Sequence, residues 1–245
     1  NYYDARFANA ADFTFFFTGA FDVKALTPLL STYIGSLPSK GAPLATIRDI
    51  GLEFPPGVKR EVVQKGREPR SQTVVSFFAD TGLDEMEMHR ARAAASVLEM
   101  RLRDVLREEL GGTYSVGVGY SNTQPQPGYG TMGVEFGSSP ENVDRLVKAV
   151  LDETSKLRDA GPSAEEVQRV QELERRELET AMRQNPYWLN SLQTVHLLGW
   201  DPVRIAKRLE RTGTLTRENI HAAFKEYFPA DRYTVVSLLP ESTQP

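Results

Sequence analysis

The stretch Leu106-Arg107-Glu108-Glu109-Leu110-Gly111-Gly112-Thr113-Tyr114-Ser115-Val116 contains the sharpest structural transition in the chain. A helical pattern ends near Arg107, two glycines break it, and an alternating, strand-like run begins at Tyr114. Arg107 carries a rigid fork of donors that suits carbonyls and carboxylates, and Tyr114 carries a hydroxyl on a stiff ring. This pair is suited to binding a peptide backbone. On this stretch alone, a surface arginine and a half-buried strand tyrosine remain an open alternative.

On the N-terminal side of this stretch, hydrophobic spacing predicts a long helix from about Asp84 to Glu109. Its expected inner face consists of Ala94, Val97, Leu98, Leu102, Val105 and Leu106. Two strands are predicted before it, over 58–66 and 72–80. Further upstream, Asp22 is expected to cap a helix that carries Val23, Leu26, Leu29, Leu30 and Tyr33. The aromatic run over 12–19 predicts a well-buried strand.

On the C-terminal side, strands are predicted over 113–122 and 129–137, joined by a proline-rich hairpin turn over 123–128. The last hundred residues are mostly helical, with helices starting near Pro140, Ser163, Pro186, Asp201 and Thr216. Ser163 and Glu166 form a predicted capping box. A final strand is expected over 233–239. This order predicts an α/β fold of the α+β type, in which helices pack on a mixed, largely antiparallel sheet.

The domain organisation follows from the same elements. We expect residues 1–245 to form a single αβ domain in which 186–245 is a helical C-terminal part with a final strand. The beginning, Asn1 to Arg6, has no signal-peptide layout and resembles the middle of a longer protein. No apolar run is long enough to span a bilayer.

Composition excludes several classes of function. Hydrophobic residues make up 40% of the 245 residues and charged residues 25%, so a sizeable core is expected. The net charge is −4 with both signs interspersed, which argues against nucleic acid as a partner. The chain has no cysteine, which excludes disulfides, thiolate zinc sites and a cysteine nucleophile.

The three histidines do not form a recognisable catalytic or metal motif. The chain contains neither His-x-x-Glu-His nor His-Glu-x-x-His. Glu85 and His89 share a helix face, a pair that is usually a weak surface contact. His196 is interpreted as a satisfied core histidine and His221 as a solvent-exposed one. The sequence therefore predicts no complete catalytic site and no metal site in this chain.

The chain resembles the insulinase/pitrilysin family of zinc metallopeptidases in three stretches. They are 9–22 with 30–38, the segment 106–116 quoted above, and 139–143 with 161–163 and 184–189. Together they extend over nearly the whole of 1–240. The resemblance implies a parent protein of two related halves, each of two αβ domains, that close on a peptide like a clamshell.

In that family the N-terminal half carries the zinc motif, and the C-terminal half supplies an arginine and a tyrosine seven residues apart. Arg107 and Tyr114 match that spacing. The resemblance implies that Arg107 binds a substrate carbonyl and that Tyr114 helps to stabilise the oxyanion. It also implies that this chain is the last, catalytically incomplete domain, and that zinc is held by the N-terminal half of the same polypeptide or by a partner subunit. Exported bacterial relatives suggest a periplasmic location.

Two other functions stay open. The same fold serves as a scaffold or interaction module in peptidase-like complexes, where Arg107 and Tyr114 would be relics. An independent hydrolase would have to use His89, His196 or His221.

Besides the Arg–Tyr pair, a free sheet edge near Tyr114 is a candidate for binding an extended peptide by strand addition. A contact surface for a sister domain is also expected, visible as exposed apolar area.

Overall fold

The computed structural model describes residues 2–41, 51–109, 113–122 and 128–241, and for 107–109, 113 and 114 it describes the backbone alone. The chain separates into two compact units. The larger consists of Gly51–Glu177 with Lys207–Pro245, and the smaller of Asn1–Ile50 with Leu178–Ala206. The turn predicted over 123–128 lies almost wholly outside the described residues. Within the described parts, no helix is long and apolar enough to cross a membrane.

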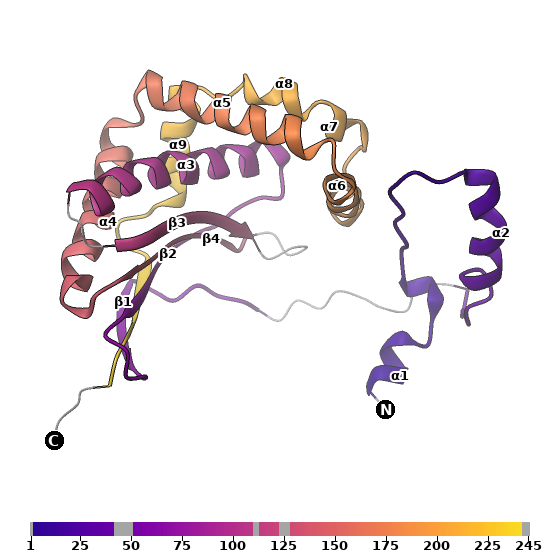
Figure 1. The fold of residues 1–245 in the computed structure, drawn as a ribbon, viewed down its shortest axis with the longest axis horizontal. Helices are drawn as coiled ribbons and strands as arrows, with labels where there is room; N and C mark the ends of the chain where they lie inside the picture. The colour runs from indigo at the N-terminus through magenta and orange to yellow at the C-terminus, as the bar shows by residue number, and fades with distance from the viewer. Residues whose placement is uncertain (1, 42–50, 110–112, 123–127, 242–245) are drawn as a thin grey trace. The chain divides into compact units, whose positions relative to one another are not determined.

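The larger unit is built on a five-stranded sheet of order β1-β5-β2-β4-β3 (Figure 1). Its strands are β1 (Val58–Gln64), β2 (Ser71–Ala79), β3 (Thr113–Asn122), β4 (Gly130–Ser138) and β5 (Tyr233–Leu239). All neighbouring pairs are antiparallel except β1 and β5, which are parallel. The predicted mixed, largely antiparallel sheet is therefore confirmed. Among the described strands, β1 and β3 form its two edges.

Helices cover one face of this sheet. They are α3 (Glu85–Arg103), η2 (Asp104–Glu109), η3 (Pro140–Asn142), α4 (Val143–Ala160), α5 (Ala164–Ala181), α8 (Arg208–Thr212) and α9 (Arg217–Tyr227). Figure 1 shows α3 between the sheet and α5. This middle position explains why α3 is rich in small alanines and is buried along most of its length. Phe77, Leu98, Phe136, Leu146 and Phe224 are at most 1% exposed and form the centre of the core.

Side-chain caps begin α3 and α5, and two predictions are confirmed here: the capping box at Ser163 and the inner face of the long helix. Asp84 caps α3, because its carboxylate accepts hydrogen bonds from the backbone N–H groups of Met86 and Glu87. The capping box at the start of α5 is present: the Ser163 N–H donates to Glu166 Oε2 at 2.6 Å, and the Glu166 N–H donates to Ser163 Oγ at 3.2 Å. Five of the six residues predicted as the inner face of the long helix are buried, and Val105 is partly buried.

The opposite face of the sheet has an apolar part near β1 and β5. Val63 on β1 pairs in register with Leu238 on β5. Their exposed fractions are 46% and 43%, and Val236 beside them is 39% exposed. We call Val63, Val236 and Leu238 the β1–β5 patch. It is the kind of exposed apolar area that the sequence interpretation required for a sister domain.

The smaller unit contains α1 (Tyr2–Phe7), η1 (Ala10–Asp12), α2 (Val23–Tyr33), α6 (Asn185–Leu197) and α7 (Val203–Ala206). The prediction of α2 and of its Asp22 cap is confirmed. The prediction of a buried strand over 12–19 is wrong. That segment belongs to no strand of the described sheet, and Phe13, Phe15 and Phe17 are 37–45% exposed. An aromatic run favours a strand, but a strand also needs a neighbour for its backbone hydrogen bonds.

Candidate functional site

The predicted pair Arg107 and Tyr114 lies where the long helix gives way to the edge strand. Arg107 is in η2, a π-helical turn that continues α3, and Tyr114 is the second residue of β3. The side chains of both residues, and residues 110–112 between them, lie outside the described parts. The backbone register of β3 shifts between Thr113 and Ser115, so Tyr114 lies at an irregularity of the strand. Bulges of this kind are common beside functional sites, where they change the direction of a side chain.

The edge of β3 carries backbone groups that β4 does not use. The Val118 N–H donates to the side chain of Glu99 on α3, at 3.2 Å from Val118 N to Glu99 Oε2. In an antiparallel strand, consecutive residues direct their backbone N–H and C=O groups to opposite sides of the strand. Since the Val118 N–H points away from β4, the other even-numbered residues of β3 also direct their backbone groups to the free edge. Glu99 also forms an ion pair with Arg103 one turn later. An edge with free donors and acceptors is where an extended peptide can pair.

A hollow of about 400 Å³ lies along this edge and the adjoining open face of the sheet. Its floor includes Gly117 and Gly119 on β3 and Gly133 on β4. A Cβ atom added to any of these three glycines would meet no atom within 4 Å. Glycines inside a strand often mark a place where another backbone approaches closely. At these three glycines the hollow therefore leaves the main chain uncovered by side-chain atoms of the residue itself.

A second cavity, of about 240 Å³, lies between α3 and α5, and we call it the α3–α5 cavity. Its polar lining is His89, Arg92 and Ser96 from α3 with Glu174 and Glu177 from α5. The Glu174 carboxylate accepts a hydrogen bond from His89 Nε2 at 2.8 Å. His89 Nδ1 is buried and has no partner among the described residues.

Arg92 brings positive charge to this cavity. The residue as a whole is exposed to solvent, yet burial of the guanidinium and the nearby Arg208 lower its pKa, while Tyr120, Glu174 and Glu85 act in the opposite direction. Because the side chain reaches water and arginine is ordinarily protonated at any pH in which proteins fold, the guanidinium is charged.

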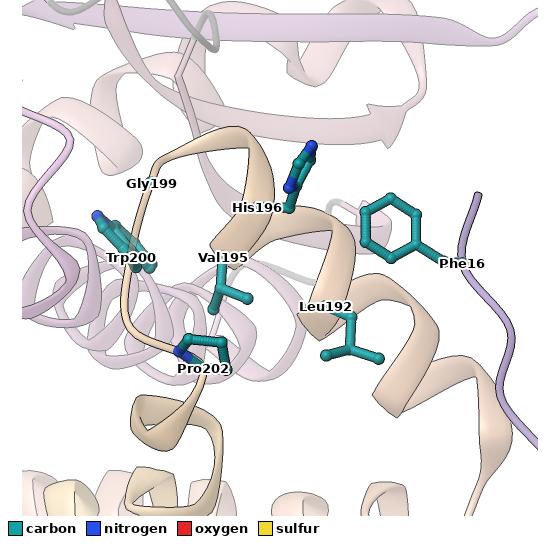
Figure 2. A pocket seen from close by; sticks show the side chains of 7 residues that line it. All are labelled: Phe16, Leu192, Val195, His196, Gly199, Trp200 and Pro202. Carbon is teal, nitrogen blue, oxygen red and sulfur yellow. The ribbon is translucent and has the colours of Figure 1, made fainter. Parts of the chain in front are cut away.

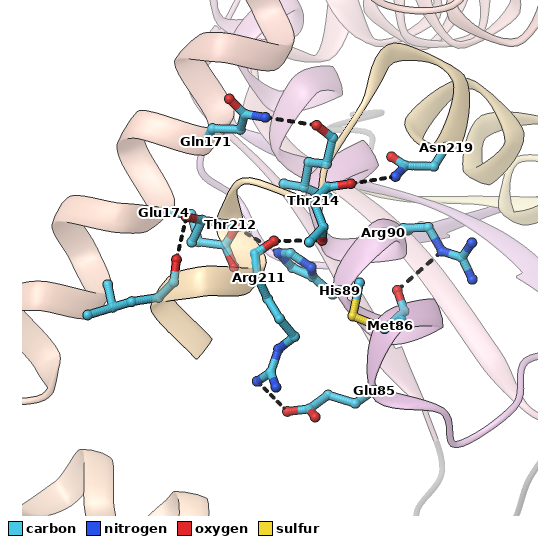
Figure 3. A network of polar contacts seen from close by, with 12 residues as sticks. Glu85, Met86, His89, Arg90, Gln171, Glu174, Arg211, Thr212, Thr214 and Asn219 are labelled. Carbon is cyan, nitrogen blue, oxygen red and sulfur yellow. Dashed lines mark hydrogen bonds and ion pairs between the residues drawn. The ribbon is translucent and has the colours of Figure 1, made fainter. Parts of the chain in front are cut away.

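The predicted surface pair of Glu85 with His89 is wrong. Glu85 is buried and accepts a hydrogen bond from Arg211 on α8 at 2.7 Å (Figure 3). Arg208 Nε lies 3.6 Å from the same carboxylate oxygen. His89 is also buried and pairs with Glu174 on α5 instead. Two helices that pack against α3 therefore supply the partners, and spacing within α3 carries no information about them.

The other two histidines also differ from expectation. His196 is exposed rather than in a core: its Nε2 lies 3.0 Å from Thr14 Oγ1, and its ring meets Phe16 edge-on. It borders a hollow of about 370 Å³ with Trp200 and Pro202 (Figure 2). His221 is partly buried and donates from Nε2 to the Arg158 carbonyl at 2.9 Å. Within the described residues, no three His, Cys, Asp or Glu side chains gather as a metal site.

With this geometry in hand, comparison with known proteins identifies the family. Residues 1–174 match the family described as the peptidase M16 inactive domain, and the chain belongs to that family. It is 26% identical over 267 residues to a "Zinc protease PQQL-like" of Arabidopsis thaliana, covering 99% of this chain and 28% of that protein. It is also 26% identical over 245 residues to the "Probable zinc protease PqqL" of Escherichia coli, covering 96% of the chain and 25% of that protein.

Solved structures share the fold. The periplasmic protease PqqL from Escherichia coli superposes with a TM-score of 0.72 at 24% identity, covering 91% of this chain and 25% of that one. A peptidase M16 inactive domain from Pseudomonas fluorescens gives 0.70 at 18% identity, covering 91% and 53%. The inferred resemblance to insulinase-type zinc peptidases is thus confirmed. The chain spans only about a quarter of the length of the curated relatives, 25–28%.

Several residues of this site were not singled out from the sequence. Gly117 and Gly119 were not singled out, although glycines within a strand are themselves a signal of close backbone approach. Glu99 gave no signal, because its contact with Val118 depends on how β3 lies against α3. Glu174 was one carboxylate among many on a charged helix.

Proposed function

We propose that this chain is the substrate-binding, catalytically incomplete C-terminal domain of a zinc metalloendopeptidase. Its role would be to hold an extended peptide while another domain of the parent protein performs hydrolysis. The observation that carries this proposal is the free edge of β3, which begins beside Tyr114 and follows the turn that carries Arg107. Membership of the inactive-domain family supports it.

The proposed peptide pairs with β3 through main-chain hydrogen bonds, which give affinity with little dependence on sequence. The glycine-lined hollow leaves room for its backbone and for alternate side chains. Arg107 would bind a carbonyl oxygen of the peptide, and Tyr114 would donate to the oxyanion that forms at the scissile bond. These roles suit a charged, planar donor and a neutral hydroxyl donor.

Zinc in this proposal belongs to another part of the parent protein. The described residues of this chain do not fit the metal, since at most two potential ligands meet in one place. When bound in the catalytic half, zinc would polarise the carbonyl and activate water. The relatives called zinc proteases support a zinc-bearing parent, and the periplasmic relative supports a periplasmic location.

The β1–β5 patch is the surface that we propose contacts the rest of the parent, either the N-terminal half of the same polypeptide or a partner subunit. Exposed valine and leucine side chains on an open sheet face favour burial against another protein surface. We further propose that residues 1–245 act together as the last domain of that parent.

The test uses the parent protein. Arg107→Ala or Tyr114→Phe should lower kcat/KM about a hundred- to a thousandfold, the usual effect of losing one donor to an oxyanion. Zinc content should not change. Near-wild-type kinetics for both variants would refute the substrate-binding assignment and favour the alternative, a scaffold or interaction subunit.

A second measurement addresses the chain alone. The purified 245-residue chain should hold no stoichiometric zinc and should not cleave a generic quenched peptide. Stoichiometric zinc with chelator-sensitive cleavage would contradict the proposal and point to an independent hydrolase built on one of the three histidines.

A further inference from the structure

The hollow along the β3 edge contains a carboxylate whose partner is a neutral group. Two carboxylates, Glu99 and Glu135, are among the described residues that line the hollow, and no lysine, arginine or histidine is among them. Glu99 forms an ion pair with Arg103. Glu135 is exposed, and its Oε1 accepts a hydrogen bond from the side-chain amide of Gln72 at 2.7 Å. Among the described residues, Glu135 Oε2 has no hydrogen-bond donor or cation as a partner. The hollow therefore offers an unbalanced negative charge to the molecule that occupies it.

The register of the sheet opens a path from the free edge to Glu135. Glu135 on β4 pairs directly with Gly117 on β3, and residues that pair directly have their side chains on the same face. Gly117 has no side chain, and a Cβ atom at this position would meet no atom within 4 Å. Along β4, the same-face neighbours of Glu135 are Gly133 and Gly137. The path over the open face from the free edge to Glu135 therefore crosses only the backbone of Gly117.

A long side chain of a bound peptide can follow this path. A peptide strand added to β3 would place one residue opposite Gly117, with its side chain on the face that carries Glu135. The Cα atoms of that residue and of Glu135 would be two strand spacings apart, about 10 Å. An extended lysine or arginine side chain reaches at least about 6 Å from its Cα, and a glutamate side chain about 4 Å. The two charged groups would therefore meet above Gly117, whereas a short side chain at that position would not reach the carboxylate.

We propose that Glu135 selects a basic side chain, lysine or arginine, at the peptide residue that lies opposite Gly117. This inference rests on the proposed addition of a peptide strand to β3, and it names the class of peptide that this edge prefers. Gln72 orients the carboxylate through Oε1, and Oε2 accepts from the ammonium or guanidinium group. Main-chain pairing supplies the affinity, and Glu135 adds a preference at one position. A glutamate or aspartate at that position would be repelled.

The experiment measures the binding of three labelled peptides to the 245-residue chain by fluorescence anisotropy at low ionic strength. The peptides share a proline-free sequence of threonine and valine and differ at one central residue, which is lysine, norleucine or glutamate. Norleucine has a long side chain without charge. The lysine peptide should bind about three- to fivefold more tightly than the norleucine peptide, because an ion pair that stays partly exposed contributes little more than that. The glutamate peptide should bind most weakly, and added salt should reduce the differences.

Three variants assign the preference to one residue. Glu135→Gln keeps the size of the side chain and an acceptor for Gln72, so it should bind the lysine and norleucine peptides equally. Glu135→Lys should reverse the preference and bind the glutamate peptide most tightly. The matched control is Glu61→Gln: exposed Glu61 lies in the same row of paired residues, through Val236 and Val74, but on β1 at the opposite edge of the sheet. It changes the net charge of the chain by the same amount and should leave the lysine preference intact.

The outcomes separate this inference from the proposed function. Equal binding of the lysine and norleucine peptides by the wild-type chain would overturn the role of Glu135 and leave strand addition in place. A lysine preference that persists in Glu135→Gln, or that is also lost in Glu61→Gln, would overturn it as well, since the net charge or another residue would then be the cause. If none of the peptides binds, strand addition at β3 fails, and the inference fails with it. Circular dichroism and urea unfolding of each variant ensure that folded chains are compared.

Discussion

Replacing Glu99 with alanine should tighten the binding of an extended peptide to this chain. Glu99 accepts a hydrogen bond from the Val118 N–H at the free edge of β3. A peptide that adds to this edge needs the same N–H for its own carbonyl, so Glu99 competes with the peptide. Removing the carboxylate leaves the edge donor free for the incoming strand.

The magnitude follows from the geometry of this contact. A hydrogen bond to a charged group contributes about 1.5–3 kcal/mol when it is well formed. Here the donor–acceptor distance is 3.2 Å, and the Glu99 side chain is 26% exposed and also paired with Arg103. We therefore expect Glu99→Ala to lower the free energy of unfolding by about 0.5–1.5 kcal/mol. The peptide no longer has to displace that contact, which corresponds to about two- to tenfold tighter binding.

The assay is fluorescence anisotropy with a labelled, proline-free peptide rich in β-branched residues, at fixed ionic strength. Glu135→Ala is the matched control, because Glu135 is an exposed carboxylate in the same hollow but on β4, where it pairs with Gln72 rather than with the edge. The control separates the loss of a competing acceptor from the loss of a negative charge. Equal tightening in both variants, or no tightening in Glu99→Ala, would refute the reasoning. Undetectable binding by the wild-type chain and by Glu99→Ala would refute strand addition at β3.

Two further predictions test the same unit. Gly119→Val should reduce peptide affinity about tenfold while the unfolding free energy stays within about 0.5 kcal/mol of wild type. The reason is that the new Cβ would meet no atom within 4 Å yet would project into the hollow where the peptide is proposed to bind. Glu61→Val on the exposed strand β1 is the control, and an equal loss of peptide affinity in that variant would contradict the site. Glu166→Gln should destabilise the chain by about 1–3 kcal/mol at pH 7, measured by urea unfolding. Burial alone raises the pKa of Glu166, but hydrogen bonds from Arg101 and Ser163 outweigh it and the net pKa is lowered. A carboxylate whose pKa is lowered by folding stabilises the folded state at pH values above its unfolded pKa of about 4.3, and this stability is lost as the pH falls through the folded pKa. The difference in unfolding free energy between wild type and Glu166→Gln should therefore shrink at pH 3. An unchanged difference would contradict the assignment.

The sequence predicted those parts of the fold whose cause is local. Helix α3 was predicted because apolar periodicity is a property of neighbouring residues, and the Asp22 cap of α2 was predicted because capping is equally local. The strands β1 to β5 were predicted because short apolar runs and the turn residues that bound them are also properties of neighbouring residues. The segment 12–19 was predicted wrongly, because its aromatic residues have strand propensity whether or not a neighbouring strand is present.

The candidate sites depend on contacts between distant residues. His89 meets Glu174 across 85 positions of sequence, and the partner of Glu85 lies 126 positions away on α8. No spacing rule within α3 reports such contacts. Which strand forms the sheet edge is likewise a tertiary property, since it depends on the order β1-β5-β2-β4-β3. Arg107 and Tyr114 were named from spacing and family resemblance, and their roles stay predictions.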